Sequence, residues 1–315
     1  VEASEIQRIV AGVEAERPLT HRLMHETLQA CEVSILGIDI VRLENGTFFA
    51  ELRLARPDTA QELQVDARPS DAIALAMREV LETKQRTATL ITPDRQLARR
   101  VTAELARWDI NIDDSAGVPL TETDPARFLM MVAEVAANGF APIPLLAMLK
   151  HPLARANDAR AIRQLERFAL RGPKPAAGTA SLRSLLNNVG IDRTAKAQAL
   201  LADLDDFMAP LIAADRKPVP EMLQALITSA EALTQETDTP ILWTDEAGEA
   251  LSQTLTRMIE ELGALGPLPL SGLPGVLRSC LAGQAIRPRR RAHPRLQILG
   301  PLEARLQQAD LTILA

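Results

Sequence analysis

The sequence predicts a helix-rich α/β protein, and three observations support this prediction. Short apolar stretches with strand-like alternation occur near the start of the chain and return at its end. Between them, from residue 124 to residue 285, apolar residues recur almost wholly at helical spacing. Hydrophobic residues make up 47% of the 315 residues and aromatic residues only 3%, so Leu, Ala, Ile and Val must form most of the core. A chain of this length can form two packed domains.

Residues 1–78 predict an α+β unit. The expected elements are helices at 3–13 and 20–28, strands at 34–43, 47–56 and 63–66, and a helix from residue 69. Thr20 is a suitable N-cap for the second helix. Asn45 and Gly46 lie between two alternating stretches, which is a strong signal for a β-hairpin.

The rest of the chain predicts a parallel sheet with a large helical insertion. The expected elements are strands at 87–92 and 110–112 around a helix from Pro93, then helices over 124–285, then strands at 295–299 and 311–314 around a helix at 302–308. Within the helical stretch, only residues 241–243 have a strand-like pattern. We therefore expect four segments, at residues 1–78, 79–123, 124–285 and 286–315.

Charge and cysteine usage limit the possible functions. The net charge is -6, so the chain lacks the overall positive field of small nucleic-acid-binding proteins, and any such contact must be local. Cys31 and Cys280 are far apart and predict two buried, inert thiols in a reducing compartment. No apolar run approaches the roughly 18 residues of a membrane span, so we expect a cytoplasmic protein without membrane contact.

A basic run near the end of the chain is a candidate nucleic-acid-binding site. Its members are Arg287, Arg289, Arg290, Arg291 and Arg295. Guanidinium groups bind phosphate through paired hydrogen bonds, so this run could neutralise several phosphates. The alternative is a solvated linker whose arginines pair with acidic residues of the same chain.

Three motifs in the first 78 residues resemble one known family. They are RPLTH at residues 17–21, NGTFFAEL at 45–52 and DARPSDAIALAMR at 66–78. These motifs resemble the bifunctional nuclease domain, a family associated with DNase and RNase activity. The resemblance implies a phosphodiester hydrolase acting on DNA or RNA, with possible homo-oligomers through this unit. The family usually has an acidic residue after the histidine of the first motif, where this chain has Arg22.

Four residues in these motifs could carry out phosphodiester hydrolysis. They are His21, Asp66, Arg68 and Asp71. The reaction requires a base or metal to activate water and cations to stabilise the transition state. Asp66 and Asp71 flank a proline turn and could share a divalent metal such as Mg²⁺ or Mn²⁺, although no cofactor is certain. Alternatively, Ser70 or Asp71 caps the helix and Arg68 pairs with Asp66.

The remaining residues resemble a second family. The motifs are LITPDRQLARRV at 90–101, DDSAG at 113–117, LLAMLKHPLA at 145–154 and RPRRRAHPRLQILGPLEARLQQADL at 287–311. They resemble AddB, the partner of an AddA-like subunit in a bacterial helicase-nuclease that processes DNA ends. The resemblance implies an incomplete RecA-like domain with its helical insertion. The chain has no GxxxxGK[ST] motif and no cluster of cysteines, so we expect neither ATPase activity nor an iron-sulfur site.

Three hypotheses follow. The first is an AddB-like DNA-repair scaffold fused to a nuclease-family unit, and the second is a metal-dependent DNase or RNase. The third is a chimaera of two unrelated fragments joined through the helix that contains AIALAMRE. Because the sequence begins within a helical pattern and ends within a strand pattern, we expect both parts to be truncated.

Overall fold

The computed structural model describes residues 27–28, 30–44, 47–56, 62–155, 158–234, 241–287 and 292–315. The chain divides into two compact units, the first formed by Val1–Gly117 with Arg289–Ala315 and the second by Val118–Pro288. The expected helix at residues 3–13 lies outside the described residues, as does most of the one at 20–28.

A three-stranded antiparallel sheet opens the first unit. Its strands, in spatial order, are β1 (Ser34–Glu44), β2 (Thr47–Ala55) and β3 (Leu63–Ala67). Glu44 pairs with Thr47, so only two residues connect β1 to β2, and the predicted hairpin is confirmed. Ala50, Leu52 and Leu54 alternate along β2 and are buried on one face of the sheet.

A parallel sheet forms the other part of the first unit. Its spatial order is β5 (Asp113–Asp114), β8 (Leu296–Leu299), β4 (Ala88–Ile91) and β9 (Leu311–Leu314). All three pairings are parallel, and α4 (Arg95–Ala106) follows β4. The predicted return of the chain to this sheet is confirmed, but four short parallel strands do not establish a RecA-like domain.

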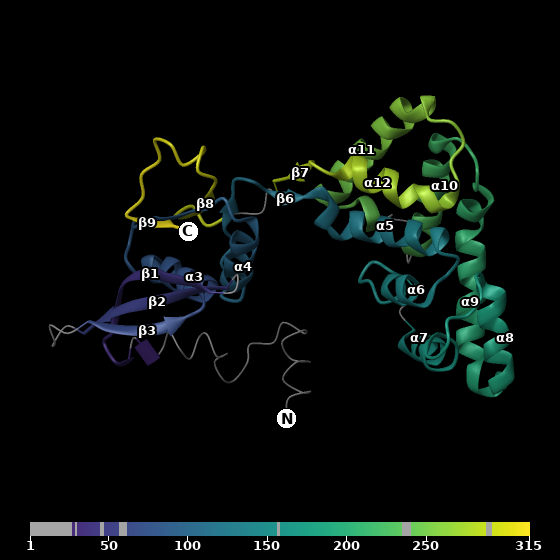
Figure 1. Ribbon diagram of the computed structural model, residues 1–315, viewed down its shortest axis with the longest axis horizontal. Coiled ribbons are helices and arrows are strands. Elements are labelled where there is room, and N and C mark those ends of the chain that lie inside the picture. Colours follow the sequence, from purple (N-terminus) through teal and green to yellow (C-terminus); the bar gives the residue numbers. More distant parts are fainter. Residues whose placement is uncertain are drawn as a thin grey trace. The chain divides into compact units, whose positions relative to one another are not determined.

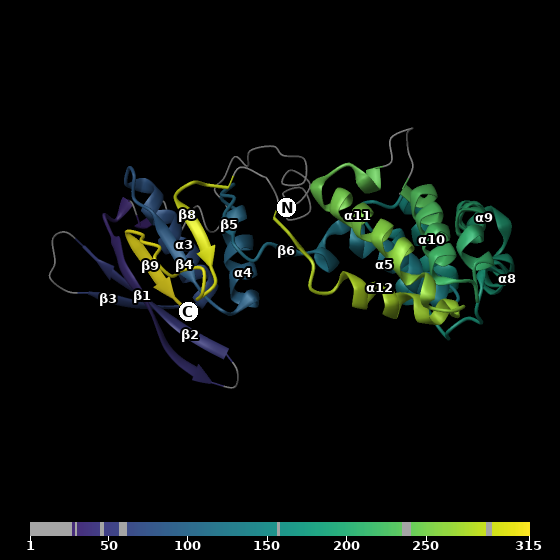
Figure 2. The same cartoon turned by 90° about the horizontal axis from the view of Figure 1, so that it is seen from above.

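The helix α3 (Pro69–Glu82) is common to both sheets (Figures 1 and 2). Ala72 and Leu75 pack with the buried residues of the antiparallel sheet. Ile73 and Met77, on the other side of the helix, pack with Leu90 and other buried residues of the parallel sheet and α4. A helix that is buried on two sides joins the sheets into one unit, so residue 78 lies inside a shared element.

Some expected features of the first unit are wrong. Asp113 and Asp114, not residues 110–112, pair with β8. Residues 302–306 form turns and residues 307–308 are irregular, so the expected helix is absent there, and Leu306 has a φ of 67°, which no regular α-helix accommodates. Cys31 is exposed, not buried.

The second unit is helical. Its helices are α5 (Asp124–Ala137), α6 (Pro142–Leu149), α7 (Ala159–Leu165), η2 (Glu166–Leu170), α8 (Thr179–Val189), α9 (Ile191–Ala213), α10 (Val219–Thr234), α11 (Glu246–Glu261) and α12 (Leu273–Leu281). A short antiparallel pair, β6 (Val118–Pro119) and β7 (Ala285–Ile286), lies where the chain enters and leaves the unit. The strand-like residues 241–243 form a 3₁₀ turn. No helix among the described residues is long and apolar enough to cross a membrane.

One apolar core fills the helical unit. The helix α5 supplies Phe128, Leu129 and Val132, all fully buried, and packs against α6, α10, α11 and α12. Cys280, half-buried, packs against this core as one of its apolar residues.

Candidate functional site

The turn from β3 into α3 holds three of the predicted site residues. Pro69 occupies the first position of α3, where a proline needs no N–H and has the correct φ for a helix. Arg68 is the N-cap residue with extended backbone, and its carbonyl accepts from the N–H groups of Asp71 (3.1 Å) and Ala72 (3.0 Å). Asp66 is the last but one residue of β3. The sequence therefore brings a carboxylate, a guanidinium and a second carboxylate to one short turn.

Asp71 lies in the first turn of α3 and accepts a hydrogen bond from the Ser70 hydroxyl (Oγ to Oδ1, 3.2 Å). The free N–H groups of a helix start favour a negative charge there. The second carboxylate oxygen, Oδ2, has no hydrogen-bond partner within the described part of the chain. Asp71 is thus an oriented carboxylate at a helix start, half-exposed to solvent.

Arg68 is exposed and does not form the ion pair with Asp66 that the structural alternative predicted. Among the described residues, no carboxylate lies within salt-bridge distance of its guanidinium. The N-cap side chain also makes no capping hydrogen bond. Its N–H groups are therefore available for an anion such as a phosphate.

Asp66 belongs to a row of three acidic residues across the antiparallel sheet. The strand register places Asp39 opposite Glu51 and Glu51 opposite Asp66. Because side chains alternate along a strand, this row is on the face opposite Leu52 and α3. Arg53 lies on the same face and its Nε is 2.9 Å from Asp39 Oδ2. One end of the row is thus neutralised, and the Asp66 end is exposed.

The geometry does not favour a metal shared by Asp66 and Asp71. Strand alternation directs Asp66 away from α3, whereas Asp71 is part of α3. No group of three or more His, Cys, Asp or Glu side chains among the described residues could hold a metal ion. His21, the other predicted base or ligand, lies outside the described residues. The described carboxylates alone therefore do not fit a divalent metal.

The basic run is only partly described. Arg287 is exposed, and Arg289, Arg290 and Arg291 lie outside the described residues. Arg295 has a structural contact that the sequence did not predict. Its guanidinium donates to the carbonyl oxygens of Thr83 (2.8 Å) and Leu81 (3.0 Å), at the end of α3. A cation that satisfies the last carbonyls of a helix also complements the helix dipole.

A polar cluster lies at the carboxyl ends of the parallel strands, where open α/β sheets commonly bind ligands. Arg95 Nη1 is 3.2 Å from Asp114 Oδ1, which also accepts from the N–H of Ala116 (3.0 Å). Glu303 accepts from the Ser115 hydroxyl and from the N–H of Gly300 (3.1 Å). These groups satisfy one another and tie the strand ends together.

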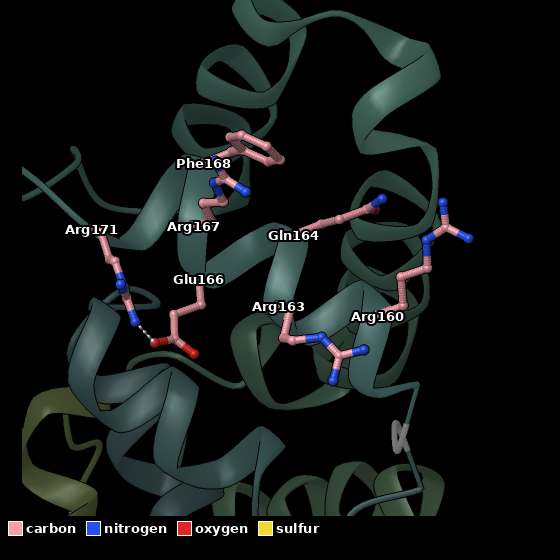
Figure 3. A pocket seen from close by; sticks show the side chains of 7 residues that line it. All are labelled: Arg160, Arg163, Gln164, Glu166, Arg167, Phe168 and Arg171. Carbon is pink, nitrogen blue, oxygen red and sulfur yellow. Dashed lines mark hydrogen bonds and ion pairs between the residues drawn. The ribbon is translucent and has the colours of Figure 1, made fainter.

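Sequence reasoning missed a second charged site in the helical unit. A hollow there is lined by Arg160, Arg163, Arg167 and Arg171, together with Gln164, Glu166 and Phe168 (Figure 3). The spacing of the four arginines, three and then four and four residues, was visible in the sequence. A count of charges in successive windows of the sequence reveals this spacing, although its arginines are less dense than those of the basic run that begins at residue 287.

Residues 1–84 match the family model of the bifunctional nuclease domain. Two curated proteins from Mycobacterium tuberculosis, one from strain CDC 1551 / Oshkosh and one from strain H37Rv, are each 37% identical to this chain over 107 residues. Both are described as uncharacterized. The aligned part covers 32% of this chain and 62% of each relative, so the chain spans less than two thirds of their length.

The match supports the nuclease interpretation of the first unit and, with it, nucleic-acid binding. The comparisons show no resemblance to AddB. The DNA-repair scaffold, the AddA-like partner and the expected oligomer therefore have no support, and the alternative hypothesis of a nuclease is favoured.

Proposed function

We propose that the first unit hydrolyses phosphodiester bonds in DNA or RNA, and that the turn between β3 and α3 contacts the reacting phosphate. The observation that carries this proposal is the position of Arg68 and Asp71 inside a region that matches the nuclease domain model. An exposed guanidinium without a carboxylate partner in the described residues and an oriented carboxylate lie three residues apart.

The two side chains suit different parts of the reaction. Arg68 would bind the non-bridging oxygens of a phosphate through paired N–H groups and stabilise the charge that develops when water attacks phosphorus. Asp71 would accept a proton from that water, with His21 as the alternative base. Asp66, on the other face of the sheet, is not required for this contact, although it was a predicted site residue. If a divalent ion takes part, the described carboxylates do not define its site.

The test is a cleavage assay with the full chain on single-stranded DNA, duplex DNA and RNA, with and without Mg²⁺ or Mn²⁺. We expect cleavage that Asp71→Asn and Arg68→Gln each reduce by about 10²-fold or more, because positioned bases and charge-stabilising groups contribute effects of that size. His21→Ala tests the alternative base.

Two control variants sharpen the assay. Glu260→Gln removes an exposed carboxylate from the helical unit and should leave cleavage unchanged. Asp66→Asn tests whether the sheet face that carries Asp66 takes part in cleavage. Full activity of this variant would exclude a site shared by Asp66 and Asp71. Absence of cleavage on every substrate, by a protein shown to be folded, overturns the proposal. Cleavage that survives both Asp71→Asn and Arg68→Gln would move the site elsewhere.

A further inference from the structure

The helical unit carries a strongly positive segment on an otherwise acidic chain. Residues 150–196 contain ten Lys and Arg against three Asp and Glu, which gives this segment a net charge of +7. The whole chain has 35 Lys and Arg and 41 Asp and Glu, so the other residues contain 25 and 38 and carry a net charge of -13. Such local concentration attracts polyanions even when the chain as a whole is negative.

Four arginines of this segment form one stripe, which we call the arginine face: Arg160, Arg163, Arg167 and Arg171. Arg160, Arg163 and Arg167 are three and then four residues apart, a spacing that places side chains on one side of a helix, and Arg171 follows directly after η2. The stripe follows α7 and then η2, a π-helical turn in which Arg171 N–H donates to Glu166 O (3.0 Å). The face lines an open hollow of about 510 Å³ (Figure 3).

Most of the charge on the arginine face is uncompensated. Arg160 and Arg163 are exposed, and neither has a carboxylate partner among the described residues. Arg167 is also exposed and lies 5.3 Å from the centre of the Phe168 ring, which Arg193 approaches at the same distance. A cation over an aromatic ring is held in place but keeps its charge.

Glu166 is the one carboxylate among the described residues that line the hollow, and it is already neutralised. Glu166 accepts from Arg171 (2.8 Å) and from Lys150 (2.9 Å). These hydrogen bonds, the one from Arg171 first, lower the pKa of Glu166 below its ordinary value. With two cations on one acid, the hollow stays positive even with Glu166 ionised.

We propose that the arginine face binds the phosphate backbone of a nucleic acid strand. The four arginines are spread along the whole segment, from Arg160 in the first turn of α7 to Arg171 directly after η2. Figure 3 shows the guanidinium groups of Arg160, Arg163 and Arg171 well apart, not converging on one point. One phosphate could contact only part of this face, whereas successive phosphates of a strand could meet successive arginines. The proposal goes beyond the proposed hydrolysis and does not depend on it.

The test measures binding without cleavage. The full chain is titrated into a fluorescein-labelled single-stranded DNA in the presence of EDTA, and fluorescence anisotropy gives the Kd at several salt concentrations. The variant with Arg160→Ala, Arg163→Ala and Arg167→Ala should bind at least about tenfold more weakly at low salt, and the slope of log K against log salt should fall by about 2.

The control variant changes the same number of charges in the first unit. Lys84→Ala, Arg100→Ala and Arg305→Ala remove three exposed cations and should change the Kd by less than about threefold, through the long-range field alone. Circular dichroism of both variants verifies folding, which substitutions of exposed side chains should preserve. Equal weakening by the two variants would show that only net charge matters and would overturn the proposal.

Two further measurements define the ligand. Inorganic phosphate or a mononucleotide should compete only at concentrations far above those of the unlabelled strand. Competition by either at a concentration similar to that of the strand overturns the proposal in favour of a small-anion site. Cleavage and binding are measured separately, so absence of cleavage by a chain that binds the strand through the arginine face, or cleavage by a chain whose binding the arginine-face variant leaves unchanged, identifies which proposal has failed.

Discussion

The helix α3 is firmly packed in the first unit, and the segment formed by α7 and η2 is firmly packed in the second. They differ in how much of their surface is buried. Residues 72–77 of α3 are six consecutive buried positions, because one sheet packs on each side of the helix. The α7 and η2 segment buries a stripe that includes Ile162, Leu165 and Ala169, and its other side is charged. A helix packed on two sides serves as core, whereas a helix packed on one side leaves a face for binding.

The largest expected effect is on the stability of α3. Ile73 is fully buried, so Ile73→Ala should lower the unfolding free energy of the first unit by about 2–5 kcal/mol. Arg163→Ala on the exposed side of α7 is the matched control and should change the stability of the second unit by less than about 0.5 kcal/mol.

The two tryptophans allow the units to be measured separately. Trp108 lies in the first unit and Trp243 in the second. In a Trp243→Phe background, urea unfolding followed by fluorescence reports on Trp108 and hence on α3. A loss below about 1 kcal/mol for Ile73→Ala would contradict the burial of this side of the helix.

The second largest expected effect is also on the stability of the first unit, and it comes from the contacts at the end of α3. Arg295→Gln removes donors from the carbonyl groups of Leu81 and Thr83 and should destabilise the first unit by about 1–3 kcal/mol. Arg295→Lys should restore only part of this loss, since a single ammonium cannot reproduce the planar fork of a guanidinium.

Strand binding by the Arg295→Gln variant tests whether Arg295 contacts nucleic acid in addition to α3. Because the Arg295 guanidinium is already engaged, Arg295→Gln should leave the strand affinity almost unchanged in conditions where the protein is folded. A loss of affinity as large as that of the arginine-face variant would instead support the basic run as a binding site.

The sequence predicted those parts of the fold that depend on local signals. Asn45 and Gly46 marked the hairpin, and the alternating stretches near residues 296 and 311 marked β8 and β9. The contact of Arg295 with α3 spans more than two hundred residues, so no local pattern could reveal it. The helix expected at 302–308 failed because apolar spacing does not report the left-handed backbone of Leu306.

The sequence indicated the residues of the candidate site but not the directions of their side chains. The motif that ends in α3 identified Asp66, Arg68 and Asp71 as candidates, and a backbone hydrogen bond from Asp71 N–H to the Arg68 carbonyl joins two of them in one turn. The side of the antiparallel sheet on which the Asp66 side chain lies could not be inferred from residue spacing, because it depends on the strand register. The arginine face was present in the sequence as a pattern, yet only the fold shows that Arg160 and Arg163 have no carboxylate partner among the described residues.

A pH-dependent effect is expected in the core of the helical unit. His151 is buried beside the Phe128 ring, and its Nδ1 accepts from the N–H of Leu153 (3.2 Å), which requires an unprotonated Nδ1. Burial lowers the pKa of His151, with an opposing contribution from the Asp124 charge. The unfolded chain therefore binds a proton at a pH where the folded chain does not.

Acidification should therefore destabilise the second unit. The unfolding free energy of the second unit should be highest above the unfolded pKa of about 6.5 and should decrease as the pH falls through that value, levelling off below the lowered folded pKa. His151→Asn keeps an acceptor without titrating and should flatten the dependence between pH 7 and pH 5. Urea unfolding in a Trp108→Phe background measures it, and an equally steep dependence in the variant would assign the effect to other groups.

The smallest expected effect is at the start of α7, where stability and binding meet. Asp158 is the N-cap residue and accepts from the N–H groups of Arg160 (2.8 Å) and Ala161 (3.2 Å) and from Lys196 Nζ (2.6 Å). Asp158→Ala should lower the thermal midpoint of the second unit by about 2–4 °C. Asp158→Asn keeps the cap and loses the ion pair with Lys196, so it should shift the midpoint less.

The same two variants should differ in strand binding, because Arg160 belongs to the first turn of α7 that Asp158 caps. Asp158→Ala disorders this turn and should weaken strand binding about twofold. Asp158→Asn also removes the negative charge but keeps the turn ordered, so it should not weaken strand binding. Tighter binding by both variants to the same degree would mean that charge alone, and not the order of this turn, determines the affinity of the arginine face.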